Sequence, residues 1–149
     1  KQALFAEIAG QLHGLLEGER DVNANLANTA SLLYHSLPDL NWAGFYLLKD
    51  GELVVGPFQG KTACVRIALG KGVCGTAAAR RSTVDVENVH EFAGHIACDS
   101  ASNSEIVVPI VRGTELIGVL DVDSPKFARF VAQDQAGLER VVAELLKAL

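Results

Sequence analysis

The stretch that decides the fold class is EIVVPIVRGTELIGVLDVDS, residues 105–124. Two apolar runs rich in β-branched residues, 105–111 and 115–122, flank a turn at 112–114. This pattern is typical of an antiparallel β-hairpin. Both alternating sets of side chains in the first run are apolar. We therefore expect both faces of the sheet to be covered here, one by helices and the other by loops or a ligand.

Four more strands are expected before this hairpin, each a short run of apolar, aromatic or β-branched residues. They span residues 42–48, 52–57, 63–69 and 83–86. Asp50-Gly51 lies between the first two runs and is the strongest short signal of a tight hairpin turn. Cys64 falls inside the third run.

Three segments with apolar residues at helical spacing, and one short segment rich in alanine, are expected to form helices. The expected helices are an N-terminal pair (4–16 and one from Val22 that ends before Pro38), a short helix at 73–80 and a C-terminal helix at 134–149. A polar loop, 88–103, is long enough to suggest a functional role. The order of elements predicts an α+β fold: an antiparallel central sheet of about six strands, with the N- and C-terminal helices packed on one face.

The composition fits a single globular domain over residues 1–149. Apolar residues make up 49% and charged residues 21% of the chain, and the net charge is −5. An acidic balance argues against a nucleic-acid groove. No apolar run approaches the roughly 20 residues that cross a membrane, and no secretory signal pattern opens the chain. We therefore expect no membrane association and a cytoplasmic location, where thiols stay reduced.

Three acidic residues interrupt the apolar hairpin at one end. Asp121 and Asp123 are two apart and share a face. A turn centred on Gly113 would place Glu105 opposite Asp121 on that same face. Such acids could be a solvated strand end or a Mg²⁺ or Ca²⁺ site, although the sequence does not follow a calcium-loop pattern. They could also line a pocket in which one acid stays protonated and donates a proton while another holds an ammonium group.

The cysteines are Cys64, Cys74 and Cys98, an odd number with no Cys-x-x-Cys pair. Each could be a small buried hydrophobe, and together with His90 or His95 they could form a Cys₃His metal site. Cys98 lies in the polar loop, where an accessible thiol can react. One exposed cysteine with partners inside the fold also suits redox chemistry, because a sulfenic acid condenses with a nearby thiol.

Six segments, in order along nearly the whole chain, resemble the free methionine-(R)-sulfoxide reductase family, which has a GAF-like fold. They are NWAGFY (41–46), VGPFQGK (55–61), GKGVCGTA (70–77), GHIACD (94–99), SEIVVP (104–109) and GVLDVDS (118–124).

The resemblance implies a reaction and a role for each cysteine. The substrate would be free L-methionine-(R)-sulfoxide, and Cys98 would be the nucleophile that becomes a sulfenic acid. Cys64 would resolve it as an intramolecular disulfide, and Cys74 would be a secondary thiol. Thioredoxin, supplied with electrons by NADPH, would recycle the enzyme, which would bind no cofactor and no metal.

The resemblance also assigns the pocket. Glu105 or Asp123 would protonate the sulfoxide oxygen, and Asp121 would suit the substrate ammonium group. Trp42 and Tyr46, four apart on one strand, would hold the S-methyl group, although aromatic residues so placed can equally be plain core. A homodimer is expected. The alternatives are a small-molecule binding module, a metal-binding structural domain and a redox sensor without turnover.

Overall fold

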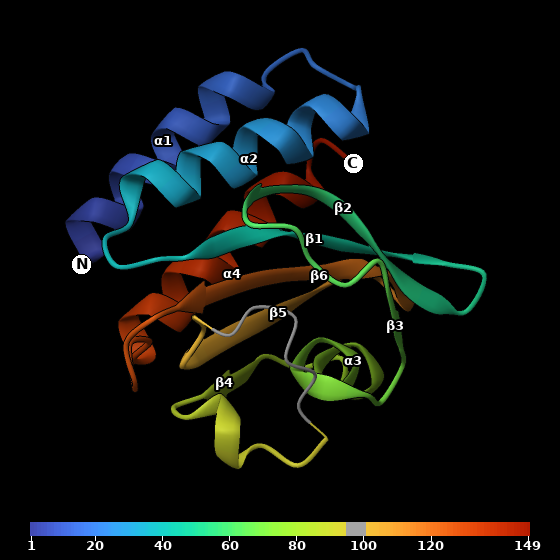
Figure 1. Ribbon diagram of the computed structural model, residues 1–149. Coiled ribbons are helices and arrows are strands. Elements are labelled where there is room, and N and C mark those ends of the chain that lie inside the picture. Colours follow the sequence, from blue (N-terminus) through green and yellow to red (C-terminus); the bar gives the residue numbers. More distant parts are fainter. Residues whose placement is uncertain (95–100) are drawn as a thin grey trace.

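The computed structural model describes residues 1–94 and 101–149. A six-stranded antiparallel sheet forms its centre (Figure 1). The elements in chain order are α1 (Gln2–Leu16), α2 (Val22–Ser36), β1 (Trp42–Lys49), β2 (Glu52–Gly60), β3 (Arg66–Ala68), α3 (Gly72–Arg80), β4 (Val84–Val86), a 3₁₀ turn (Val89–Glu91), β5 (Ser104–Arg112), β6 (Glu115–Ser124) and α4 (Ala132–Leu146). The α+β class and the six strands predicted from the sequence are confirmed.

The strands lie in the order β3-β2-β1-β6-β5-β4. Every neighbouring pair is antiparallel, and the two strongest hairpin signals form β1–β2 and β5–β6. β6, the strand that ends in the acidic residues, therefore lies at the centre of the sheet between β1 and β5.

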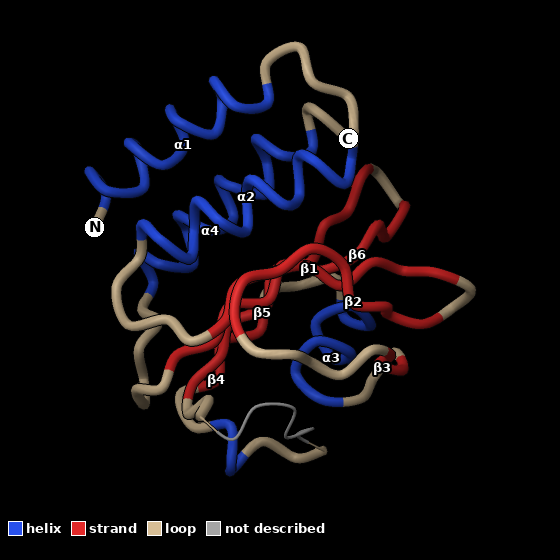
Figure 2. Tube along the Cα trace, turned by 45° about the horizontal axis from the view of Figure 1, so that its top comes forward, coloured by secondary structure: helices blue, strands red, loops and turns tan. Residues whose placement is uncertain are grey.

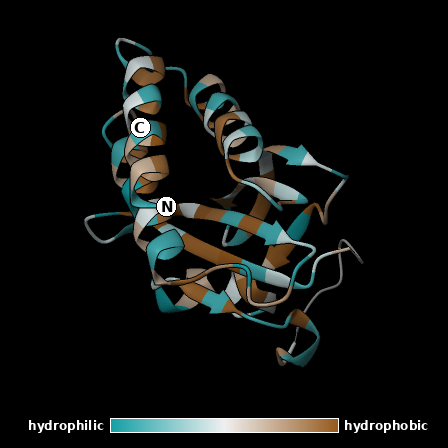
Figure 3. Ribbon diagram, turned by 90° about the vertical axis from the view of Figure 1, so that its left-hand side faces the viewer, coloured by the Kyte–Doolittle hydropathy of each residue, from teal (hydrophilic) through white to brown (hydrophobic). Residues whose placement is uncertain are grey.

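The N- and C-terminal helices lie on one side of the sheet, as predicted: α2 and α4 pack on its face, and α1 packs against both of these helices (Figure 2). Their apolar stripes meet alternate residues of the central strands, among them Ile106 and Leu120, which are fully buried. In Figure 3, hydrophobic segments recur along the strands, and hydrophobic and hydrophilic segments alternate along the helices. This layer is the larger hydrophobic core.

The opposite face is covered by α3 and the segments beside it. A second, smaller core lies here, in which Val107 and Val119 pack with Val73 and Ala77 of α3. The sequence predicted loops or a ligand on this face, and the structure adds a helix. The two cores explain why the β5–β6 hairpin is apolar on both faces.

The third strand is shorter than predicted, and Cys64 lies outside it. β3 starts at Arg66 because it pairs with only the first three residues of β2, and one further hydrogen bond joins the Val55 N–H to the Val65 carbonyl. Residues 61–64 leave the sheet and pass over the face that carries α3.

Within the described residues, no helix is long and apolar enough to cross a membrane.

Candidate functional site

The three acidic side chains lie in two adjacent rows of the sheet. In one row, Asp123 of β6 lies between Trp42 of β1 and Glu105 of β5; in the next, Asp121 pairs with Gly44. Paired residues, and residues two apart on a strand, share a face. The three carboxyl groups therefore point to one side of the sheet, the side that carries α3. This confirms the predicted shared face.

The predicted pairing within that face was wrong. Glu105 lies opposite Asp123, and not opposite Asp121. The turn contains two residues, 113–114, where a three-residue turn was expected, and the register shifts once more beyond Ile110 through a bulge. The two changes move the pairing by two residues in total, which preserves the face and replaces the partner.

Burial and crowding hold protons on this cluster. Glu105 and Asp121 are 8% and 5% exposed. Loss of hydration and the neighbouring carboxylates Asp123 and Glu105 raise the pKa of Asp121 well above its usual range. Loss of hydration and Glu105 likewise raise the pKa of Asp123. Because such groups cannot all ionise together, the cluster can donate a proton and still keep negative charge for a cation.

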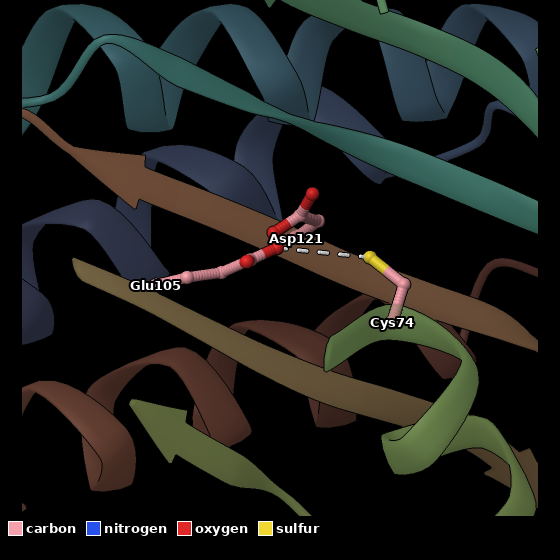
Figure 4. A group of neighbouring side chains, drawn as sticks. All are labelled: Cys74, Glu105 and Asp121. Atoms are coloured by element: carbon pink, nitrogen blue, oxygen red, sulfur yellow. Dashed lines mark hydrogen bonds between the residues drawn. The ribbon is translucent and has the colours of Figure 1, made fainter. Parts of the chain in front are cut away.

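Cys74, in the first turn of α3, points at this cluster (Figure 4). Its Sγ lies 3.9 Å from Glu105 Oε2 and its side chain is buried. Burial, followed by the charges of Asp121, Glu105 and Asp123, raises the pKa of the thiol. In this arrangement Cys74 is a protonated thiol, which is a poor nucleophile.

Two stacked aromatic rings form a second wall of the site. Trp42 and Tyr46 have ring centroids 5.9 Å apart with an interplanar angle of 26°, and Phe58 stacks on Trp42 at 5.0 Å. The Trp42 indole N–H donates to the Lys61 carbonyl, and the Tyr46 hydroxyl donates to the Cys64 carbonyl, both at 3.0 Å. The aromatic pair thus fixes residues 61–64 over the sheet.

A pocket opens between these groups. The three carboxyl groups, the two aromatic rings, and residues 62–63 and 71–74 all line it. It contains acids that hold protons, an apolar ring surface and a thiol. The pocket can therefore accept a small molecule with a cationic group, a proton-accepting atom and an apolar end.

Comparison with known proteins assigns the family. The GAF domain model matches residues 21–149. The free methionine-R-sulfoxide reductase of Escherichia coli is 56% identical over 149 residues, which is all of this chain and 90% of that protein. The enzyme of the same name from Saccharomyces cerevisiae is 41% identical, over 95% of this chain and 83% of that protein. The crystal structure of the Neisseria meningitidis free methionine-R-sulfoxide reductase in complex with its substrate superposes with a TM-score of 0.96 at 45% identity, covering 99% of this chain and 89% of that chain.

The chain belongs to the free methionine-R-sulfoxide reductase family. Its sheet and helices form the GAF fold that the resemblance implied.

The structure brings most of the predicted site residues of this reductase-family chain together. Trp42, Tyr46, Cys74 and the three acids all line the one pocket. Cys64 lies in the segment that the aromatic rings fix over the sheet, and it is disulfide-bonded. Cys98, His95 and the predicted Cys64–Cys98 pairing fall outside the described residues, so the role of Cys98 stays a prediction.

Sequence reasoning missed several pocket-lining residues, among them Ser102 and Lys71. The Ser102 hydroxyl lies 3.4 Å from Asp123 Oδ2 and accepts a hydrogen bond from the Asn41 amide at 2.9 Å. Lys71 lines the pocket at the start of α3. Ser102 has no local signal, because its partner is brought close by the fold. The Gly-Lys-Gly sequence around Lys71 did mark a turn beside a helix start.

The described residues contain one group of side chains that could hold a metal ion: Cys74, Glu105 and Asp121, with ligand atoms within 4.8 Å of one another. Three ligands are one fewer than the four of a structural zinc site. His90 is not in this group; its ring nitrogen lies 2.8 Å from Asn103 Oδ1.

Proposed function

We propose that this protein reduces free L-methionine-(R)-sulfoxide to L-methionine. The observation that carries the proposal is the acidic pocket of the sheet, found in a chain that matches enzymes of that name along nearly its whole length. Free methionine sulfoxide has an ammonium group, a polar S–O group and an S-methyl group. The pocket has a surface of matching chemistry for each of these.

The acids supply proton and charge. The sulfoxide oxygen gains negative charge as its sulfur is attacked, so a protonated carboxyl group beside it stabilises the transition state. Glu105 or Asp123 would fill this role, because they lie side by side in one row. Asp121, one row further along, would bind the ammonium group. The rings of Trp42 and Tyr46 would hold the methyl group.

The thiols would carry the electrons. The Cys98 thiolate attacks the sulfoxide sulfur, the protonated oxygen transfers to Cys98, and methionine leaves with its sulfur reduced. The Cys64 thiol then condenses with the Cys98 sulfenic acid, which forms an intramolecular disulfide and releases water. The disulfide-bonded state of Cys64 supports this assignment. Cys74, whose thiol stays protonated, would be a secondary thiol.

Recycling needs an external dithiol. A thioredoxin reduces the disulfide by exchange and is itself reduced at the expense of NADPH, so the protein needs no bound cofactor. A cytoplasmic location and a homodimer form part of the same proposal.

The test of the proposal is NADPH consumption in the presence of thioredoxin and its reductase, with each epimer of free methionine sulfoxide. We expect turnover of the R epimer and formation of one methionine per NADPH oxidised. A protein without R-selective turnover would contradict the proposal.

Variants at the cysteines separate the two thiol roles. Cys98→Ser should abolish even the first turnover. Cys64→Ser should release one methionine per protein in a rapid-quench experiment and then stop, because the sulfenic acid has lost its resolving partner. Loss of that first turnover in Cys64→Ser would reverse the assigned roles. Cys74→Ser should keep the first turnover.

A further inference from the structure

We propose that the open edge of the sheet at β3 is the surface on which the dithiol protein that reduces the oxidised enzyme docks. This surface consists of Lys61, Val65, Arg66 and Leu69, and we call it the β3 edge surface. A partner bound there brings its nucleophilic thiol to Cys64. The inference rests on the proposed function, in which a thioredoxin recycles the protein, and it names where on the fold that partner binds.

The position of Cys64 restricts where a protein reductant can bind. Cys64 is disulfide-bonded and half-buried. The Tyr46 hydroxyl donates to its carbonyl at 3.0 Å, which holds the residue beside the sheet. Thiol–disulfide exchange requires a thiolate to reach bonding distance of a disulfide sulfur. A protein reductant therefore has to cover the chain around Cys64, and β3 begins two residues further on.

Two exposed apolar side chains flank β3 at this point. Val65 exposes 60% of its surface, more than any other large hydrophobic residue that the structure describes, and Leu69 exposes 40%. Between them, Ile67 is buried in the smaller core. Single exposed apolar residues are ordinary on a protein surface. A pair of them beside a disulfide offers apolar contact area to the partner that has to approach it.

The backbone of β3 is also open on its outer side. β3 is the last strand of the sheet and pairs with β2 alone (Figure 1). The Val55 N–H donates to the Val65 carbonyl, so by alternation the backbone groups of Arg66 and Ala68 point away from β2. The Ala68 carbonyl accepts from the Lys71 N–H, which leaves the N–H and carbonyl of Arg66 on the open edge. Such an edge can pair with an extended segment of a partner.

The charge of this edge differs from that of the whole molecule. Residues 53–70 contain Lys61 and Arg66 and no acidic residue, in a chain whose net charge is −5. Arg66 pairs with Glu52 at 2.8 Å, whereas Lys61 is exposed and forms no ion pair with a described residue. Complementary charge therefore favours a reductant with an acidic rim around an apolar contact surface.

The exchange balances with the reductant as the sole co-reactant. Its first thiolate attacks Cys64 Sγ and forms a mixed disulfide, and the other sulfur of the Cys64 disulfide leaves as a thiolate that takes up a proton. The second thiol of the reductant loses its proton and attacks its own neighbour in the mixed disulfide, which releases Cys64 as a thiol. One dithiol is oxidised for each disulfide that is reduced.

The test measures reduction of the preformed disulfide, so it needs no methionine sulfoxide. Oxidised protein is mixed with reduced thioredoxin or with dithiothreitol, and the free thiols are counted by maleimide labelling and mass spectrometry after an acid quench. For Val65→Ser and for Leu69→Ser we expect the rate constant with thioredoxin to fall about fivefold. The rate constant with dithiothreitol, which needs no docking surface, should stay within about twofold. Val22→Ser, a similarly exposed apolar residue (43%) at the start of α2, is the matched control and should change neither.

Trapping identifies the sulfur that is attacked. A thioredoxin whose second cysteine is replaced by serine stops at the mixed disulfide, and peptide mapping should place that disulfide on Cys64. A mixed disulfide on another cysteine, equal losses with both reductants, or rates with thioredoxin that match those of Val22→Ser would overturn the inference. A wild-type protein that thioredoxin reduces through this surface, but that reduces neither epimer of free methionine sulfoxide, would overturn the proposed function and leave this inference standing.

Discussion

At the scale of single residues, the acidic side chains of the pocket lower the stability of the fold that holds them. Asp121 lies among buried neighbours, next to two other carboxyl groups, and its charged form is costly there. Strand pairing holds Glu105 and Asp123 on the same face. Their carboxyl groups therefore cannot move apart without breaking the pairing of β5 with β6. The proposed binding of an ammonium group would require the site to accept this cost in the absence of its ligand.

Asp121→Asn should therefore stabilise the protein while it removes activity. The variant keeps the side-chain shape and removes one buried charge, so the free energy of unfolding at pH 8 should rise by about 1–3 kcal/mol. Urea denaturation measures this change. Glu115→Gln, an exposed acid on the same strand, is the control and should stay within about 0.5 kcal/mol of the wild type. A less stable Asp121→Asn protein at pH 8 would contradict the prediction.

The pH dependence of that difference follows from the sign of the pKa shift. The pKa of Asp121 is raised on folding, so the folded state binds the proton more tightly than the unfolded state. The wild type is therefore most stable below the ordinary Asp pKa of about 4, and this stability is lost as pH rises through the raised value. The stability gain of Asp121→Asn should be small near pH 4 and grow with pH. A gain that is constant from pH 4 to pH 8 would contradict this assignment.

At the scale of elements, α1 and α4 approach each other very closely at one glycine. Gly137 of α4 lies against Phe5 of α1 so closely that an added Cβ would fall 2.2 Å from the ring. Phe5 is itself buried in the larger core. The glycine thus sets the distance between two helices that are far apart in the sequence.

Gly137→Ala should destabilise the protein by about 1–3 kcal/mol, because the overpacking exceeds the gain in helix propensity. Gly10→Ala, on α1 with open space around the new methyl group, should instead stabilise by about 0.5–1 kcal/mol. Chemical denaturation of both variants measures the opposite signs. In a Phe5→Ala background the cost of Gly137→Ala should shrink; an undiminished cost would exclude the ring as its cause.

At the scale of the whole molecule, the sheet divides the protein into two layers. Its helix-covered face holds the larger core, and its other face holds the acids, the aromatic pair and α3. Residues that alternate along β5 and β6 contribute to the two layers in turn. We therefore expect substitutions in the larger core to change stability with little effect on the chemistry of the opposite face.

Leu138→Ala tests this division. Leu138 of α4 is fully buried on the helical side, so its truncation should lower the free energy of unfolding by about 2–5 kcal/mol. At a temperature where the variant is still folded, its kcat/KM for the proposed substrate should remain within about twofold of the wild type. A large loss of kcat/KM in folded protein would show that the two layers are coupled.

Much of this organisation could be predicted from the sequence. Helical spacing, an alanine-rich run and β-branched runs indicated every α-helix and strand of the described chain, because the apolar pattern has to match the layer that buries it. The 3₁₀ turn Val89–Glu91 lies in the predicted polar loop and was missed. The shared face of the three acids followed from the two-residue period of a strand. Pairing partners did not follow, because turn length and the bulge beyond Ile110 leave no clear trace in residue type.

The missed parts of the site depend on contacts between distant segments. Cys64 was expected inside a strand, but the Tyr46 hydroxyl binds its carbonyl and the chain leaves the sheet there. Ser102 and Lys71 acquire their significance only when β6 and α3 are brought to the same pocket. Local sequence reasoning finds the residues whose pattern is local, and it misses those positioned by tertiary structure.

The indole of Trp42 has a practical consequence. It is the only tryptophan in the chain, and it lies in the wall of the pocket, where it stacks with Tyr46 and with Phe58 and its N–H donates to the Lys61 carbonyl. Tryptophan fluorescence of this protein therefore reports on the pocket alone, because no second tryptophan contributes to the signal. Ligand entry, and movement of the segment that bears Cys64, can be followed in real time on the unlabelled protein.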